Sequence, residues 1–347
     1  MKVVVAPDSY KECLSSREVA SVIGKALLMA HPDWDVVEMP LSDGGEGTVD
    51  VLTRALGGTI VQADVSDPLG RPVKASYGIV DGTSGTAGGT AIIEVAQACG
   101  LGLLAPSERN PLLTSTRGVG ELLLAAYERG CRHFIVGLGG SATCDGGAGM
   151  LSVPGIVEAL RDATFEILCD VDNPFVGPSG AARVFGPQKG ASTQDVEVLE
   201  QRMLEQAARL KAATGIDVSS VPGAGAAGGL GGAFIACFGA RLCSGIDKVL
   251  HLLNFEAVVA DAQLVITGEG RSDSQTLAGK AAYGVLRRSG RVPVVLLSGR
   301  IDSREDLLAA GFSSLVEVSP RSLPHSQALD PAIATVNLVA AVTHNLI

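Results

Sequence analysis

Loops that combine acidic residues with glycine recur along this chain, and most of them follow a short apolar run that predicts a buried β-strand. The acids in these loops are Asp8, Asp43, Glu46, Asp145, Asp170, Asp172, Glu269 and Asp273. Each one alone is more often a turn former or a helix cap than a catalytic group. Together they predict one acidic cleft lined by strand ends, because open α/β sheets bind ligands at the carboxyl ends of their strands.

The most glycine-rich loop is GLGGSATCDGGAG, residues 137–149, in which Asp145 separates two glycine clusters. The apolar residues 133–136 before it predict a strand. Glycine allows a positive φ and a close backbone approach to a ligand, and successive N–H groups can hold phosphate oxygens. The loop therefore predicts a phosphate-binding site, with a tight turn at a strand end as the alternative.

Carboxylates beside glycine loops suit Mg²⁺ and a polyphosphate, because Mg²⁺ binds a few carboxylates together with waters and phosphate oxygens. A remaining carboxylate can accept the proton of a substrate hydroxyl during in-line phosphoryl transfer. The cations in or beside these loops are Lys11, Lys189, Arg271 and Lys280. They are candidates for binding a carboxylate substrate or for stabilising the negative charge on the phosphate being transferred. The alternative for each is that it is an ordinary solvent-exposed surface charge.

Strand–loop–helix units at both ends of the chain must position most of these acids. Residues 3–6 and 36–40 predict two strands, each followed by an acid-bearing loop and then a helix. The same order returns after Asn254, with a strand and loop over residues 264–270 and another over residues 293–299. This alternation predicts a parallel sheet.

The middle of the chain has a different pattern. Residues 59–65 and 73–80 flank turn residues and predict a β-hairpin. We therefore expect an α/β protein in which a discontinuous, Rossmann-like parallel-sheet domain, residues 1–60 and 255–347, carries an inserted mixed α/β domain, residues 61–254. The active-site cleft is expected between these two domains.

Composition narrows the function classes. Of the 347 residues, 46% are apolar and 18% are charged, which is enough apolar material for two domains. The net charge of −10 and the pI near 5.0 argue against binding to nucleic acid or to an anionic membrane. The seven cysteines contain no CxxC pair, the five histidines lack metal-ligand spacing, and the N-terminus does not predict a signal peptide. We therefore expect a cytoplasmic location.

Two other interpretations remain open. Gly137, Gly139 and Ala142 fit the loose dinucleotide pattern GxGxxA after a strand, which would suit an NAD(P)-dependent oxidoreductase of a small hydroxy acid. A non-catalytic sugar-acid or nucleotide-binding sensor is the second interpretation. The many loop carboxylates and cations fit chemistry better than sensing.

Eight short segments form a set that spans nearly the whole chain. They are APDSYK (6–11), SDGGEGTVD (42–50), ERNPLLTST (108–116), GLGGSATCDGGAGM (137–150), CDVDNP (169–174), FGPQKGA (185–191), GAAGGLG (225–231) and TGEGRSDSQTLAGK (267–280). In these segments and in their order, the chain resembles the bacterial glycerate kinases of the type-1 family, and as a set they are highly specific.

The resemblance implies ATP-dependent phosphorylation of D-glycerate with Mg²⁺, and a two-domain α/β architecture with a cleft. It favours 2-phosphoglycerate as the product, with 3-phosphoglycerate as the alternative. D-glycerate and ATP are thus the expected small-molecule partners, and a homodimer is a further expectation.

Residue roles follow from chemistry applied to these matching positions. The catalytic candidates are Asp172, Asp273, Lys11, Lys189 and Arg271, with Asp172 or Asp273 as the base. The substrate-binding candidates are Asp8, Ser9, Asp43, Gly44, Gly45, Glu46, Asn173 and Lys280. The candidates for binding ATP are Gly137, Gly139, Gly140, Ser141, Thr143, Gly146, Gly147 and Glu269. The candidate Mg²⁺ ligands are Asp145 and Asp170.

The chain departs from the family pattern in two places. Where the family usually has Ile-Asp-Gly-Gln-Thr, this chain has Ser-Asp-Ser-Gln-Thr, with Ser272 and Ser274 as the differing residues. Between Met150 and Phe165 the chain is shorter than the family pattern, which has a further strand and turn there. Either a peripheral hairpin is lost or a segment is missing from this sequence.

Overall fold

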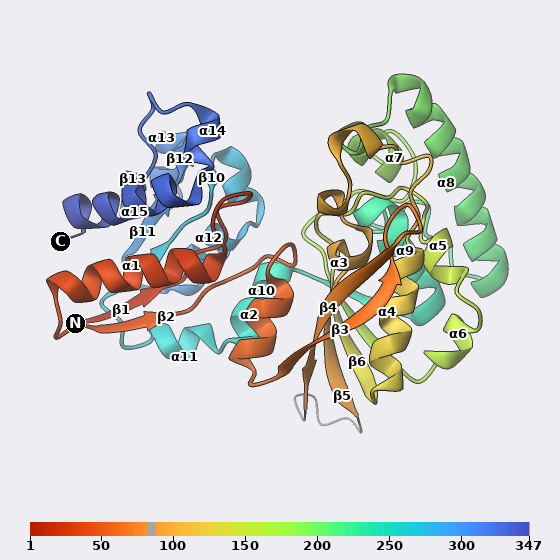
Figure 1. The fold of residues 1–347 in the computed structure, drawn as a ribbon, viewed down its shortest axis with the longest axis horizontal. Coiled ribbons are helices and arrows are strands. Elements are labelled where there is room, and N and C mark those ends of the chain that lie inside the picture. The colour runs from red at the N-terminus through yellow and green to blue at the C-terminus, as the bar shows by residue number, and fades with distance from the viewer. Residues whose placement is uncertain (82–87, 347) are drawn as a thin grey trace. The chain divides into compact units, whose positions relative to one another are not determined.

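The computed structural model describes residues 1–81 and 88–346 (Figure 1). The chain forms two compact units, the first from Met1–Asp43 together with Ile246–Ile347 and the second from Gly44–Gly245. The first unit is therefore discontinuous in sequence.

A parallel five-stranded sheet forms the centre of the first unit, which confirms the predicted parallel sheet. From one edge to the other its strands are β2 (Asp35–Glu38), β1 (Lys2–Val5), β9 (Leu264–Thr267), β11 (Val294–Ser298) and β13 (Ser314–Glu317). The winding direction of the sheet changes between β1 and β9. In such sheets ligands bind at this switch point, outside the carboxyl ends of the strands.

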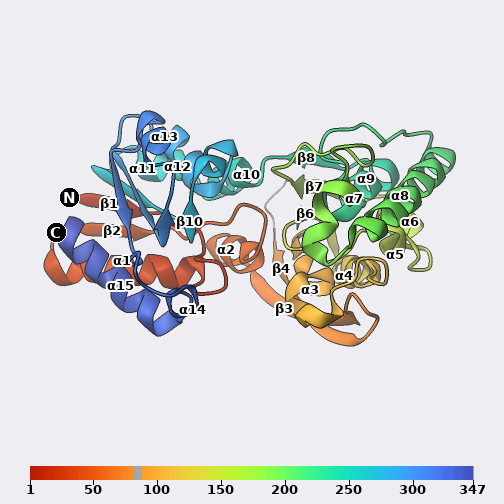
Figure 2. The same cartoon turned by 90° about the horizontal axis from the view of Figure 1, so that it is seen from above.

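Helices cover both faces of this sheet, as its buried apolar strands require. Figure 2 shows on one side α1 (Ser16–Ala30) and α15 (Pro331–Asn345), and on the other α11 (Phe255–Val259), α12 (Ala281–Arg288) and α13 (Arg304–Ala309). The apolar sides of α1 and α15 pack on Val3, Val5 and Ile266. This packing fixes the strand ends from which the acid-bearing loops leave.

Short elements continue from the carboxyl edge of this sheet. Strands β10 (Arg271–Ser272) and β12 (Arg300–Ile301) pair in parallel just beyond β9 and β11. The 3₁₀-helix η4 (Ser274–Ala278) follows β10, and the short helix α14 (His325–Ala328) follows β13.

A six-stranded mixed sheet forms the centre of the second unit. Its strands, in spatial order, are β3 (Thr59–Ser66), β4 (Pro72–Val80), β5 (Gly89–Glu94), β6 (Cys131–Gly137), β7 (Thr164–Leu168) and β8 (Arg241–Cys243). The predicted hairpin is confirmed, since β3 and β4 are antiparallel from Thr59 opposite Ile79 to Ser66 opposite Pro72. Strands β5 to β8 are parallel neighbours.

The helices of the second unit pack around this sheet. They are α2 (Thr48–Ala55), α3 (Ala96–Cys99), α4 (Arg117–Glu128), α5 (Ala148–Leu151), α6 (Ile156–Ala159), α7 (Ala181–Phe185), α8 (Thr193–Thr214) and α9 (Ala226–Phe238), with 3₁₀ turns η1 (Leu101–Leu103), η2 (Pro106–Glu108) and η3 (Pro187–Lys189). The short helices α5 and α6 lie between the loop after β6 and strand β7. None of the helices among the described residues is long and apolar enough to cross a membrane.

The units divide at residues 43 and 246, whereas the sequence predicted boundaries near residues 60 and 255. Helix α2 follows β2 in the chain, but it packs on β3, β4 and β5 of the second unit. Helix α10 (Gly245–Leu252) lies with the first unit, where Ile246 contacts Gly284 of α12. Tertiary packing therefore sets both boundaries.

Candidate active site

A cavity of about 630 Å³ opens at the carboxyl edge of the first unit's sheet. Among the residues that line it, seven were predicted from the sequence: Asp8, Ser9, Lys11, Asp43, Glu269, Arg271 and Lys280. They come from the loops after β1, β2 and β9 and from the start of α12. The fold thus brings together segments that are more than 200 residues apart in the chain, at the position where this class of sheet binds ligands.

Asp8 is the most deeply buried carboxylate of this cavity, with 6% of its surface exposed. Its Oδ1 accepts a hydrogen bond from Ser9 N at 2.7 Å, and its own N–H donates to Gly268 O at 2.9 Å. Burial raises the pKa of Asp8 well above its usual value, and the neighbouring Asp43 raises it further, while Lys11 opposes both. A carboxylate held in this way has a strong tendency to bind a proton or a cation.

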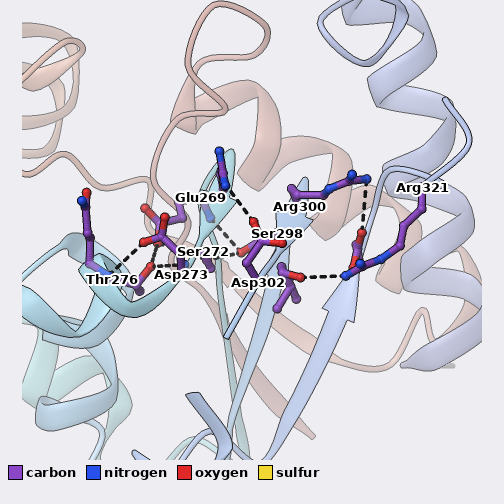
Figure 3. Close-up of polar contacts among 12 residues, drawn as sticks. Glu269, Ser272, Asp273, Thr276, Ser298, Arg300, Asp302 and Arg321 are labelled. Atoms are coloured by element: carbon purple, nitrogen blue, oxygen red, sulfur yellow. Dashed lines mark hydrogen bonds and ion pairs between the residues drawn. The ribbon is translucent and has the colours of Figure 1, made fainter. Parts of the chain in front are cut away.

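Glu269 lies on the floor of the same cavity, where hydroxyl groups fix its side chain (Figure 3). Its Oε1 accepts hydrogen bonds from Ser272 Oγ at 3.0 Å and Thr276 Oγ1 at 2.6 Å, and its Oε2 is 3.5 Å from Lys280 Nζ. Burial raises the pKa of Glu269, although Lys280 and the two hydroxyls lower it. Glu269 is therefore an oriented acceptor rather than a mobile one.

Ser272 gives the first departure from the family pattern a local explanation. Besides bonding to Glu269, its hydroxyl lies 2.8 Å from Ser298 Oγ at the end of β11. A buried hydroxyl needs such partners. Ser272 therefore ties the β9 and β11 loops together through a polar contact.

Asp273, one of the two candidates for the base, caps η4. Its Oδ1 accepts from Gln275 N at 2.9 Å, while its N–H donates to Thr276 Oγ1 at 3.0 Å. This is the capping geometry that an aspartate adopts before a helix. A base role for Asp273 stays a prediction, and the geometry itself explains the residue without one.

The glycine loop lies in the second unit, against the backbone of the loop that precedes α2. Gly139 N donates to Gly44 O at 3.3 Å. A Cβ on Gly137 would lie 2.3 Å from Gly44 O, and one on Gly139 would lie 2.6 Å from Gly45 Cα. Glycine is required here because two backbones touch. The structure thus brings these four predicted residues together.

Asp145, predicted as a metal ligand, braces the glycine loop. Its carboxylate accepts from Gly147 N and Gly149 N at 3.0 Å each, and from Thr116 N and Oγ1 at 2.9 Å each. These bonds hold the loop against the start of α4 and explain the residue structurally. Within residues 1–81 and 88–346, no group of three or more His, Cys, Asp and Glu side chains is placed to hold a metal ion.

Lys189, predicted to be catalytic, is buried with 3% of its surface exposed. Its Nζ donates to Ser141 Oγ at 2.9 Å and to Thr143 O at 2.6 Å. Burial lowers the pKa of Lys189. The ammonium therefore holds the two loop residues from inside the second unit.

The remaining predicted residues of the second unit occupy several environments. Gly147 faces the interior, since a Cβ there would lie 2.4 Å from Ala233 Cβ, and Gly146 faces Gln206 and Phe175 in the same way, whereas Gly140 is exposed. After β7, Asp170 Oδ1 accepts a hydrogen bond from Gly245 N at 2.9 Å. Asn173 Nδ2 donates a hydrogen bond to Ser179 O at 2.8 Å. Asp172 and Glu46 are exposed.

The sequence interpretation missed Glu94 and Arg300. Glu94 ends strand β5 and is buried, and its Oε1 accepts from Val49 N at 2.6 Å, near the start of α2. The sequence feature that could have identified Glu94 is an acidic residue at the end of an apolar strand. Arg300 lines the cavity of the first unit. Its signal is the Gly-Arg pair after β11, which repeats the Gly-Arg pair after β9.

Changing Glu94 to Gln is expected to flatten the pH dependence of stability below neutrality. Burial raises the pKa of Glu94 from 4.5 to about 7. The folded protein therefore holds the proton more tightly than the unfolded chain, and its stability falls as the pH rises through that window. The loss amounts to about 3 kcal/mol in the wild type. Urea unfolding at pH 5 and pH 8 measures this difference in the free energy of unfolding. Glu158→Gln, at an exposed position, is the control. If the difference between the two pH values were the same in the Glu94 variant as in the wild type, the raised pKa of Glu94 would be contradicted.

The dinucleotide interpretation of Gly137, Gly139 and Ala142 has little support in this geometry. In a dinucleotide fold the helix that receives the pyrophosphate starts within the glycine motif. Here α5 begins only at Ala148, and Ala142 is buried with its N–H donated to Cys99 O at 2.7 Å.

Comparison with known proteins gives a consistent result. The chain matches the model of the glycerate kinase family over residues 3–158 and 151–347. It is 41% identical to the glycerate kinase of Bacillus subtilis (strain 168), with 96% of this chain and 94% of that protein covered. It is 44% identical to the glycerate 2-kinase of Escherichia coli (strain K12), with 87% and 86% covered.

The fold agrees with these matches. A crystal structure of a protein described as glycerate kinase 2 from Salmonella typhimurium LT2 superposes with a TM-score of 0.80 and 38% identity, covering 100% of this chain and 98% of that one. The two segments that match the family model overlap at residues 151–158, within the region that the sequence predicted to be shorter than the family pattern. On these grounds the chain belongs to the glycerate kinase family and is an enzyme of that family.

Proposed function

We propose that this enzyme transfers the terminal phosphate of ATP to the 2-hydroxyl of D-glycerate, giving 2-phosphoglycerate and ADP. The observation that carries the proposal is the cavity of the first unit, where Asp8, Asp43 and Glu269 face Lys11, Arg271 and Lys280. Carboxylates and cations in one cavity suit a reaction in which charge moves from a nucleotide to an anionic acceptor. The similarity to a glycerate 2-kinase supports the 2-hydroxyl as acceptor.

In this reaction the hydroxyl oxygen of glycerate forms a bond to the γ-phosphorus while the bond from that phosphorus to the bridging oxygen of ADP breaks. The hydroxyl proton must pass to a base. Asp8 is the carboxylate in the cavity best suited to accept it, because burial and Asp43 raise its pKa. Asp172 and Asp273 remain the alternatives predicted from the sequence.

The residues of this cavity also fit Mg²⁺. The donor set consists of carboxylate oxygens, which Mg²⁺ prefers, and the cation usually takes only one or two of them and fills its shell with water and phosphate. Because Asp8 is assigned the proton, two other carboxylates of the cavity, Asp43 and Glu269, are the residues that would hold the ion. When bound, the ion supplies positive charge to the phosphate oxygens.

Purified protein is expected to form ADP from ATP only when D-glycerate is present, and phosphorus NMR of the product is expected to show 2-phosphoglycerate. A coupled ADP assay with and without D-glycerate, and with EDTA as the control for Mg²⁺, measures the first part. ATP hydrolysis that is independent of glycerate would contradict the proposed acceptor. A spectrum of 3-phosphoglycerate would contradict the proposed position of transfer but not the class of reaction.

A further inference from the structure

We propose that the cavity of the first unit is the nucleotide site, with the adenine against an apolar wall and the phosphates on the paired arginines Arg271 and Arg300. This inference rests on the proposed phosphoryl transfer from ATP. It also places ATP on the discontinuous unit, whereas the sequence predicted that the glycine loop of the second unit binds it.

The cavity is large enough for a nucleotide. Its volume of about 630 Å³ lies within the range of roughly 300–1,000 Å³ that is common for pockets that enclose drug-sized ligands. A three-carbon hydroxy acid would leave most of this space empty. A nucleoside triphosphate is a ligand of the right size.

The side chains that line the cavity follow the order of the strands along the edge of the sheet. Asp8 follows β1, Glu269 follows β9, Arg300 follows β11 and Val318 follows β13, and these strands are neighbours in that order. The cavity therefore has its carboxylates, with Lys11 and Lys280 beside them, at the β1 and β9 end and apolar residues at the β13 end. ATP has the same polarity, from its metal-binding phosphates to its base.

The two arginines lie on neighbouring strands of the β10–β12 ribbon. Strands β10 and β12 pair in parallel with Arg271 directly opposite Arg300, so their side chains leave the ribbon side by side at a strand spacing of about 4.8 Å. Two adjacent guanidinium groups are well suited to phosphate oxygens, since each can donate two parallel hydrogen bonds.

The local charge balance leaves these arginines attractive to an anion. Arg271 Nε is 3.0 Å from Asp302 Oδ2, and Arg300 Nη1 is 3.7 Å from Glu317 Oε1, beyond hydrogen-bond distance. Glu317 is shared with Arg304 and Arg321, so in these ion pairs four arginines meet two carboxylates, Asp302 and Glu317. Such an excess draws phosphate toward the β10–β12 ribbon.

An apolar wall forms the part of the cavity beyond β13. Val318, Leu323, Ala328 and Leu329 line the cavity, the last two at the end of α14, and the Cys13 thiol lies 3.8 Å from Ala328 O across from them. Glycerate has no apolar surface that could use this wall. A purine ring does, and apolar lining with a few placed polar groups is the usual composition of a nucleotide pocket.

Photolabelling with 8-azido-ATP tests where the base binds. The label is expected in the peptide that contains residues 318–334, and excess ATP is expected to prevent it. Labelling that ATP competes away but that maps to residues 137–149 would overturn the inference and return ATP to the second unit. Wild-type protein that is labelled as expected but forms no ADP with glycerate would instead overturn the proposed reaction and leave the nucleotide site in place.

Matched variants test the two halves of the cavity. Arg300→Gln is expected to raise the KM for ATP about tenfold or more with little change in the KM for glycerate, because a charged hydrogen bond to phosphate is lost. Arg304→Gln is the control, since Arg304 also pairs with Glu317, at 3.9 Å, but is not among the described residues that line the cavity.

Ala328→Phe is expected to raise the KM for ATP by filling the apolar half, whereas Ala332→Phe, at an exposed position in the first turn of α15, is expected to behave as wild type. Thermal unfolding confirms that each variant is folded. A raised KM for glycerate with an unchanged KM for ATP in Arg300→Gln and Ala328→Phe would overturn the inference, because the cavity would then hold the acid.

Discussion

Changing Asp8 to Asn is expected to lower kcat by about 100- to 10,000-fold, which is the usual contribution of a positioned acid–base group, while making the folded protein more stable above neutral pH. The two effects have one cause. Asp8 is buried beside Asp43, so ionising it is costly, and the same cost makes it a good proton acceptor. A residue kept at a cost to stability is typical of an active site.

The sign of the stability effect follows from the direction of the pKa shift. Because the pKa of Asp8 is raised in the folded protein, folding is favoured most below the pKa of the unfolded chain, and stability falls as the pH rises toward the folded pKa. Asparagine cannot ionise, so the variant lacks this fall. Its advantage over the wild type should therefore grow with pH and level off above the folded pKa.

Melting temperatures between pH 5 and 9, together with kcat and both KM values at pH 8, measure the two effects. Asp50→Asn is a suitable control, because Asp50 lies on the surface of α2 in an i,i+4 pair with Arg54. Near-normal kcat in the Asp8 variant would exclude this residue from the reaction. A lower melting temperature at pH 8 would contradict the conclusion that its charge is unfavourable in the folded state.

The sequence predicted most of the charged residues that line the first unit's cavity, because they lie at strand ends. Apolar runs such as residues 3–6 predict parallel strands, and the carboxyl ends of parallel strands meet at one edge. Asp8, Glu269 and Arg271 follow such runs directly, and all three line the cavity. Here the position of a residue relative to a strand was enough to place it.

The same reasoning did not place the charged residues of the second unit. Asp145 and Lys189 lie in loops of the same composition, but their contacts are set by residues 29 to 48 positions away, Thr116 for the first and Ser141 for the second. Spacing in the sequence does not show whether a loop cation turns outward or inward. Arg300 was missed for a related reason. Its proposed role in binding phosphate depends on the strand register that places it opposite Arg271.

The local hydrophobic pattern of a helix does not show which of the two units the helix packs against, as α2 illustrates. Helix α2 has the length and amphipathic spacing expected of a helix after a parallel strand, and in sequence it continues the first unit. It packs instead on β4 and β5, and Glu94 at the end of β5 fixes its first turn through Val49 N. A long-range hydrogen bond of this kind has no counterpart in the local pattern.

Changing Lys189 to Ala is expected to destabilise the second unit by about 2–4 kcal/mol, because it leaves buried hydrogen-bonding groups unpaired and creates a cavity. The groups are Ser141 Oγ and Thr143 O, both bonded to Lys189 Nζ in the folded protein. Lys189→Met preserves most of the volume and removes only the donors, so its loss should be smaller. Urea unfolding followed by a probe in the second unit measures both.

Lys211→Met is the matched control, since Lys211 is a largely exposed residue of α8 that pairs with Asp217, and exposed pairs contribute less than about 1 kcal/mol. The same series separates a bracing role from a catalytic one. If Lys189 only stabilises the loop, turnover in Lys189→Met falls because residues 141–143 are less well ordered. Lowering the temperature then restores part of the turnover. Wild-type stability in Lys189→Met, combined with a turnover reduced a hundredfold or more, would instead show that the ammonium acts on the substrates, because only an effect on the reaction itself can lower the rate without weakening the fold.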